Sequence, residues 1–146
     1  MLSLVTAGIF SSLSPHFELL GNVLFVGNNA VFYGGAISLT DPIEFHIIGT
    51  RFESNTGTSG GAVSVAATRA TTGGFKRCRF DGNVAVNGGA LFLSADDTGV
   101  LDNARGVQGS VFVHNTAGER SSTYILHGLN LLIAFCRYYQ LTVSSS

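Results

Sequence analysis

A two-part motif recurs three times along this chain of 146 residues and strongly constrains its fold. Each copy reads Phe-x-x-Asn and continues, five or six positions later, as Gly-Gly-Ala-apolar-x-apolar. A fourth copy keeps only the first part. An internal repeat of this kind predicts a solenoid, in which each copy is one structural unit. The residues that define the repeat are Phe25, Asn28, Gly34, Gly35, Phe52, Asn55, Gly60, Gly61, Phe80, Asn83, Gly88, Gly89, Phe112 and Asn115.

The spacing of the copies predicts how the chain coils. With Tyr138 as a fifth member, the aromatic positions are 27, 28, 32 and 26 residues apart. The longest interval contains residues 96–106, where Asp, Gly and Asn cluster as in loops, so we interpret this segment as an insertion. Short alternating segments before each aromatic residue predict strands at 18–24, 44–51, 75–79 and 107–111. A period of about 27 residues with glycine turns favours a parallel β-solenoid.

Composition agrees with an all-β fold and excludes several classes of function. Glycine supplies 19 of the 146 residues, which weakens helices, and the 45% share of hydrophobic residues argues against disorder. A formal charge of −1 with only 8 Lys and Arg lacks the basic footprint of a nucleic-acid-binding protein. We find no apolar run near the roughly 20 residues of a membrane-spanning helix.

The repeat assigns a physical role to each recurring residue. Successive coils of a parallel solenoid lie about 4.8 Å apart, so equivalent side chains stack. We expect the aromatic residues, with Tyr138 last, to form one inward column. The Asn residues are expected at a bend, where their amides bond the turn backbone and the Asn of the next coil. The Gly-Gly pairs predict a second bend, and Ala36, Ala62 and Ala90 are expected in a tight interior corner.

These motifs resemble the repeat of the chlamydial polymorphic outer-membrane proteins, whose hallmark is Phe-x-x-Asn together with Gly-Gly-Ala-(Ile/Leu/Val). The resemblance covers about residues 17–126. It implies a right-handed, single-stranded parallel β-helix. In that family such helices form autotransporter passengers and serve adhesion at the cell surface. The chain has no translocating β-barrel sequence, so we interpret it as a fragment or as one segment of a larger assembly.

The sequence therefore predicts one all-β domain over residues 1–146, with five coils of about 27 residues. The expected repeats are 17–43, 44–71, 72–98 and 107–130, with a partial repeat at 131–143. We interpret residues 1–10 as a buried first strand, with a signal peptide as the alternative, because no Lys or Arg precedes the apolar core.

The expected function is that of a non-enzymatic structural or adhesive scaffold on a cell surface or in a secreted protein. The alternative is a carbohydrate-active β-helix that binds or cleaves polysaccharide, as a lyase or glycoside hydrolase. We expect no catalytic, metal-binding or cofactor-binding residues. Expected partners are a protein or glycan surface, or adjoining chains stacked on the coil ends, and neither nucleic acid nor a membrane span is expected.

Two pairs of charged residues flank the aromatic column and have two interpretations. Arg51 and Glu53 stack over Arg79 and Asp81 in the predicted register. Two carboxylates about 5 Å apart can cleave a glycosidic bond, and some β-helix proteins are polysaccharide-cleaving enzymes. An exposed ladder of salt bridges is the simpler interpretation, and we favour it because the repeat places no third catalytic group beside these residues.

The remaining polar and thiol side chains have simple expected roles. Asp96, Asp97 and Asp102 lie in the insertion, where we favour a solvated or contacting loop over a calcium site. His114 is expected at a bend. The other histidines, His16, His46 and His127, are expected to be structural. Cys78 and Cys136 occupy equivalent slots two coils apart, about 9.6 Å, so we expect buried free thiols and no disulfide.

Overall fold

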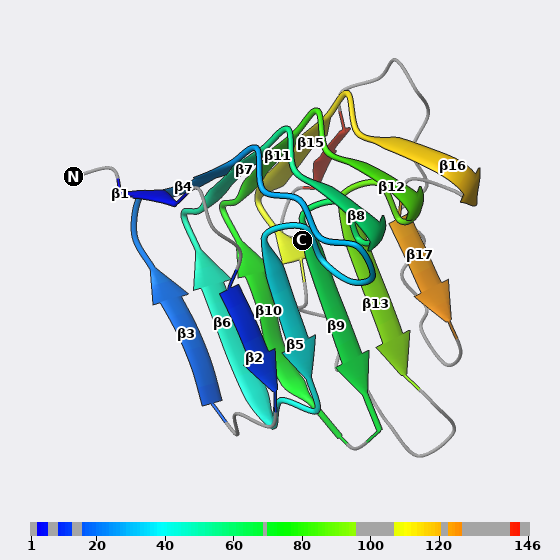
Figure 1. Cartoon of the computed structure of the whole chain (residues 1–146). Helices are drawn as coiled ribbons and strands as arrows, with labels where there is room; N and C mark the ends of the chain where they lie inside the picture. Colours follow the sequence, from blue (N-terminus) through cyan, green and yellow to red (C-terminus); the bar gives the residue numbers. More distant parts are fainter. Residues whose placement is uncertain are drawn as a thin grey trace.

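The computed structural model describes residues 3–5, 9–12, 16–68, 70–95, 107–120, 123–126 and 141–143. All regular structure in these ranges is β, in eighteen strands that form four sheets, and the predicted fold class is confirmed. Figure 1 shows two sheets of long strands that face one another, with two further sheets closing the coil at one end of them. The molecule is a parallel β-solenoid.

Each sheet collects one strand from each coil. The first sheet contains β3 (His16–Leu20), β6 (Glu44–Ile48), β10 (Thr72–Lys76) and β14 (Val107–Gln108). The second contains β1 (Ser3–Val5), β4 (Val23–Val26), β7 (Arg51–Glu53), β11 (Arg79–Asp81), β15 (Ser110–Val113) and β18 (Leu141–Val143). The third contains β8 (Thr56–Ser59), β12 (Val84–Asn87) and β16 (Thr116–Arg120). The fourth contains β2 (Ile9–Ser12), β5 (Ile37–Thr40), β9 (Val63–Ala67), β13 (Leu91–Ala95) and β17 (Thr123–Leu126).

Within the described residues, the phenylalanine column makes fewer coils than the five predicted. From Phe25 through Phe52 and Phe80 to Phe112, each phenylalanine pairs in parallel with the next, which makes three turns. The strand β18 then pairs antiparallel with β15 and aligns Leu141 with Phe112, so it does not continue the parallel stack. Tyr138, expected in the fifth coil, lies outside the described residues. At the other end, the predicted single strand over residues 1–10 is two strands, β1 and β2.

The predicted aromatic column is confirmed over four rungs. The ring centroids are 5.2 Å apart between Phe25 and Phe52, 4.9 Å between Phe52 and Phe80, and 4.6 Å between Phe80 and Phe112. Adjacent rings are nearly parallel, at 9°, 6° and 6°, and all four side chains are buried. Phe75 of the first sheet packs edge-on against Phe80, which joins this column to the rest of the core.

The Asn residues form a second, buried column, and the predicted bond between Asn residues of successive coils is confirmed. In each of three steps the backbone N–H and the Nδ2 of one Asn both donate to Oδ1 of the next, at 2.8–3.0 Å. The same Nδ2 of Asn55, Asn83 and Asn115 also donates to the carbonyl of the Phe in the preceding coil. These bonds satisfy both amide protons of Asn55 and of Asn83, so their burial leaves neither proton without a partner.

The strands predicted before each aromatic residue are each divided in two by a corner. Gly49, Arg77 and Gly109 have φ values of 67°, 52° and 53°, which turn the chain from the first sheet into the second. The alternation of apolar and polar residues does not reveal this turn between sheets, because apolar positions continue on both sides of the corner. A second corner lies two residues after each Phe, where Ser54 and His114 have φ values of 53° and 52°. The prediction that His114 lies at a bend is confirmed.

Successive coils approach closely at the Gly-Gly-Ala corner. A Cβ atom on Gly61 would lie 2.0 Å from the carbonyl oxygen of Gly89 in the next coil, so only glycine allows the two backbones to approach. The following residues Ala36, Ala62 and Ala90 are fully buried at the predicted interior corner. The backbone N–H of Ala62 and of Val63 both donate to the Ala90 carbonyl, at 2.9 and 3.0 Å, which holds the coils in register.

Candidate functional site

A groove of about 300 Å³ lies on the outer face of the first sheet. It exists because β10 contains two adjacent glycines, Gly73 and Gly74, with φ values of 105° and 149°. A Cβ atom on Gly73 would lie 1.9 Å from the Phe45 carbonyl oxygen, so β10 cannot carry a side chain at this position. Because Gly74 also has no side chain, the surface of β10 between Thr72 and Lys76 is left open. The groove is lined by Glu44, His46, Ile48, Thr72, Gly73, Gly74, Phe75, Lys76 and Gln108.

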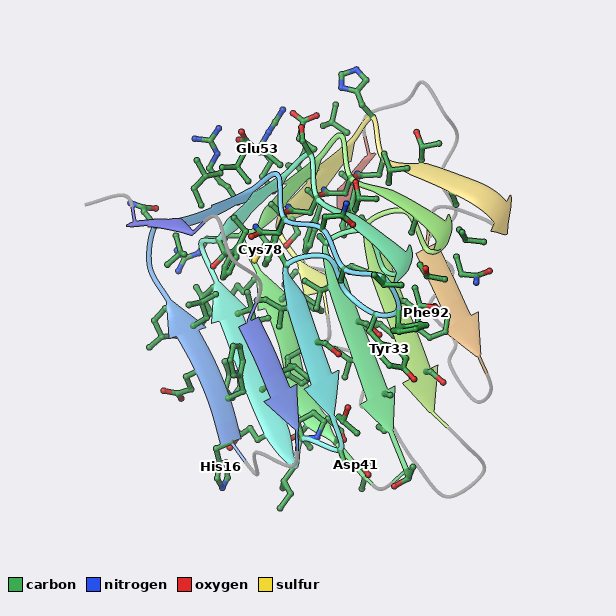
Figure 2. All side chains as sticks on the ribbon, viewed as in Figure 1. His16, Tyr33, Asp41, Glu53, Cys78 and Phe92 are labelled. Atoms are coloured by element: carbon green, nitrogen blue, oxygen red, sulfur yellow. The ribbon has the colours of Figure 1, made fainter. Side chains whose placement is uncertain are left out.

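A carboxylate held between two histidines stands at one end of this groove. Oε1 of Glu44 lies 2.9 Å from Nε2 of His46, and Oε2 lies 3.2 Å from Nδ1 of His16. The hydrogen bond to His46 is the main cause that lowers the pKa of Glu44, and the bond to His16 adds to it. Figure 2 shows His16 at the beginning of β3, beside the strand that carries Glu44.

The histidines of this cluster were expected to be structural, and the sequence pattern did not indicate their association with Glu44. Parallel pairing aligns His16 directly with Glu44, 28 residues later. His46 lies two residues beyond Glu44 on the same strand, so the two side chains share a face. The separation of His16 and Glu44 by one coil was therefore the signal that the sequence offered for this cluster. It was missed because neither histidine belongs to the recurring motif.

The opposite end of the groove carries a positive charge and an amide. Lys76 is the last residue of β10 and pairs with Gln108 of β14. Along a strand, the four steps from Thr72 to Lys76 span about 13 Å. Glu44 pairs with Thr72, so the carboxylate and the ammonium group belong to opposite ends of the groove. Their opposite charges leave the groove with little net charge.

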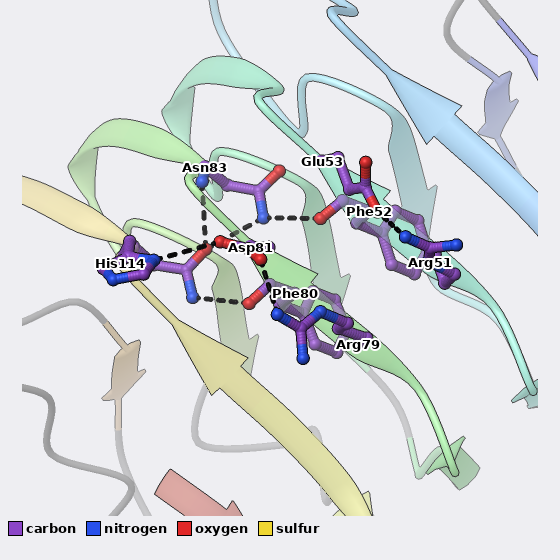
Figure 3. Close-up of polar contacts among 9 residues, drawn as sticks. Arg51, Phe52, Glu53, Arg79, Phe80, Asp81, Asn83 and His114 are labelled. Carbon is purple, nitrogen blue, oxygen red and sulfur yellow. Dashed lines mark hydrogen bonds and ion pairs between the residues drawn. The ribbon is translucent and has the colours of Figure 1, made fainter. Parts of the chain in front are cut away.

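The flanking charged residues form the predicted ladder of salt bridges (Figure 3). Arg51 binds Glu53 through Nη2, and Nη2 of Arg79 donates to Oδ2 of Asp81 at 2.7 Å. His114 adds a contact of 3.3 Å to the other oxygen of Asp81. Burial raises the pKa of Asp81, but the bonds and charges of Arg79 and His114 outweigh it, and the pKa is lowered. Glu53 and Asp81 are thus each paired with an arginine of the same strand, and Asp81 also contacts a histidine of the next coil.

Cys78 is a buried free thiol, as predicted. Its Sγ donates to the carbonyls of Ile47 and Lys76, at 3.2 and 3.5 Å, beside the first corner. Burial raises the pKa of Cys78 to about 11, which suppresses the reactive thiolate. The thiol therefore has a packing role in the native fold.

An exposed apolar loop lies on another part of the surface, between β4 and β5. Val31, Phe32 and Tyr33, the 31–33 loop, are 74%, 71% and 55% exposed. The next coil supports the backbone of this loop through two hydrogen bonds. Oγ1 of Thr58 donates to the Val31 carbonyl, and the N–H of Ser59 donates to the Phe32 carbonyl at 3.1 Å. Figure 2 shows Tyr33 projecting beside the fourth sheet.

Several predicted positions lie outside the described residues, namely Asp96, Asp97, Asp102, His127 and Cys136. Within the residues that the structure describes, no group of three or more His, Cys, Asp or Glu side chains is arranged to hold a metal ion. The described portion also has no helix with the length and hydropathy needed to cross a bilayer.

Comparison of the chain with protein-family models, with curated proteins and with solved structures found no match. The parallel solenoid fold therefore stands on the repeat and the structure. The resemblance to the polymorphic outer-membrane proteins remains a prediction from the two-part motif.

Proposed function

We propose that this chain is a non-enzymatic structural or adhesive scaffold on a cell surface or in a secreted protein. The observation that carries this proposal is the location of the repeat. The recurring Phe, Asn and Ala side chains are buried in internal columns. Outward positions vary along the stack, as in the row Leu24, Arg51, Arg79 and Val111, where only the two middle coils share a residue. A rigid core with a variable exterior suits the presentation of binding surfaces.

The 31–33 loop supplies a contact surface of the kind that adhesion requires. Aromatic side chains are enriched in the centres of protein interfaces, where they bury a large area at low entropic cost. Phe32 and Tyr33 are exposed, yet hydrogen bonds from the next coil hold the loop backbone. We infer a protein or glycan surface as the partner, and adjoining chains on the coil ends are a second possible contact.

An adhesion assay with the intact chain tests the proposal. Beads coated with the chain are expected to bind cells, and the double variant Phe32→Ser/Tyr33→Ser is expected to lower the bound fraction about tenfold, because loss of a hot-spot contact exceeds 1.4 kcal/mol. Leu20→Ser is the matched control, since Leu20 is 61% exposed on a different sheet.

Two results would contradict the proposal. Coated beads that do not adhere to any cell type tested would remove the adhesive role. Release of reducing ends from polysaccharide by the purified chain would instead establish the carbohydrate-cleaving alternative.

A further inference from the structure

We propose that the groove on the first sheet binds a short uncharged saccharide unit of a glycan. This inference builds on the proposed adhesive function but uses a site separate from the 31–33 loop. The groove volume of about 300 Å³ lies at the lower end of the range for ligand pockets, which suits a small ligand. Its length of about 13 Å along β10 accommodates adjacent sugar rings.

The lining of the groove matches the hydrogen-bonding chemistry of sugar hydroxyls. A hydroxyl both donates and accepts, so it needs acceptors and donors close together. Glu44 supplies carboxylate oxygens, Lys76 supplies ammonium donors, and Thr72 and Gln108 supply both kinds of group. The Gly73–Gly74 backbone and the side chain of Ile48 form less polar parts of the lining, against which the C–H face of a sugar ring can pack.

Glu44 is oriented before any ligand arrives. His46 and His16 contact different oxygens of its carboxylate, at 2.9 and 3.2 Å, and each oxygen retains a further lone pair. A carboxylate that is already fixed loses little conformational freedom on binding, which favours affinity. His16 does not line the groove and is therefore a positioning residue.

The charge and the backbone of the groove favour a saccharide over other ligands. One carboxylate and one ammonium group at opposite ends suit an uncharged ligand better than a polyanion. An extended peptide usually binds by adding a strand to a sheet edge. On one side of β10 this mode is closed by β6, which pairs with Thr72–Lys76, and on the other side β14 occupies the edge at Phe75 and Lys76.

Titration of the full chain by NMR tests the inference. The probes are short uncharged oligosaccharides of glucose, galactose, mannose and N-acetylglucosamine, with uronic-acid oligosaccharides and tripeptides for comparison. At least one uncharged oligosaccharide is expected to shift the amide signals of Gly73, Gly74 and Lys76. Glu44→Gln is expected to weaken this binding about tenfold, as for loss of hydrogen bonds to a charged group.

Glu53→Gln is the matched control, because Glu53 is a half-buried carboxylate on the second sheet with its own cation. It is expected to leave saccharide affinity unchanged. His16→Ala is expected to weaken binding less than Glu44→Gln, and His16→Gln to restore part of the loss by holding the carboxylate again. Binding that persists in Glu44→Gln, shifts produced only by uronic acids or tripeptides, or no shift with any saccharide would each overturn the inference.

The bead assay separates this inference from the proposed function. Adhesion without saccharide binding would remove the groove as a glycan site and leave the adhesive scaffold intact. Saccharide binding without adhesion would support the groove as a glycan site and contradict the adhesive function.

Discussion

Two phenylalanines, Phe52 and Phe32, show how strongly a residue's contribution to the stability of the fold depends on its place in the coil. Phe52 is completely buried between two parallel rings, whereas Phe32 is 71% exposed in the 31–33 loop. The position of Phe52 was predictable because it recurs with the coil period. Phe32 belongs to no repeating position, so its exposure required the structure.

Phe52→Ala is expected to lower the free energy of unfolding by about 3–5 kcal/mol, because it removes a large buried side chain and leaves a cavity. Phe32→Ala is expected to change it by less than about 0.5 kcal/mol, as is usual at exposed positions. Urea titration followed by circular dichroism measures both values. Equal effects of the two substitutions would contradict the stacked column.

The Asn column predicts a large effect for a polar residue. Asn55→Ala removes the acceptor of both Asn28 N–H donors and the donor to the Phe25 carbonyl. Each buried group left without a partner costs about 1–3 kcal/mol, so the expected loss in unfolding free energy is about 2–5 kcal/mol. Asn29→Ala, at an exposed neighbouring position, is the control and is expected to be nearly neutral. A neutral Asn55→Ala would show that the column does not stabilise the coil.

At the scale of strands and corners, the positions of the strands were predictable from the sequence but their ends were not. The period aligned Phe25, Phe52 and Phe80 correctly because a stack repeats by translation. The corner at Arg77 was missed, because an arginine with positive φ carries none of the signal that a glycine provides. The groove was missed for a related reason: Gly73 and Gly74 occur in one coil only, and their effect depends on the neighbouring strand β6.

The Gly-Gly corner gives a prediction at this scale. Gly61→Ala is expected to destabilise the fold by several kcal/mol or to prevent folding, because its Cβ atom would lie 2.0 Å from a backbone oxygen. Gly118→Ala is the matched control, since its Cβ atom would meet nothing closer than 3.6 Å. Thermal unfolding compares the two. A stable Gly61→Ala protein would mean that the coils are spaced more widely than described.

At the scale of the whole molecule, two carboxylates with lowered pKa values contribute to the response to acid. Glu44 and Asp81 both have lowered pKa values in the fold, and both contact a histidine of a neighbouring coil. A carboxylate with a lowered pKa stabilises the fold above its unfolded pKa, and this contribution is lost as the pH falls through the folded pKa.

The free energy of unfolding is therefore expected to decrease between about pH 5 and pH 3, and Glu44→Gln or Asp81→Asn is expected to make this decrease shallower. Urea titrations at several pH values measure the slope. If both variants keep the wild-type slope of unfolding free energy against pH, other carboxylates govern acid unfolding.

The number of coils could not be predicted from the repeat alone. Aromatic spacing suggested a fifth rung at Tyr138, but β18 aligns Leu141 with Phe112 in the antiparallel direction. A spacing pattern fixes which residues are equivalent. It does not fix the direction in which a strand runs, because parallel and antiparallel pairs bury the same apolar side chains.

The Asn column also gives the solenoid a direction. In each step from Asn28 to Asn115, Nδ2 of the earlier Asn donates to Oδ1 of the later Asn. The amide dipoles therefore add instead of cancelling, and each bond polarises the next. The two ends of the column differ electrically, with acceptor oxygens facing the first coil. Another coil of the same kind can extend this column head to tail, whereas a head-to-head junction would set like dipoles against each other.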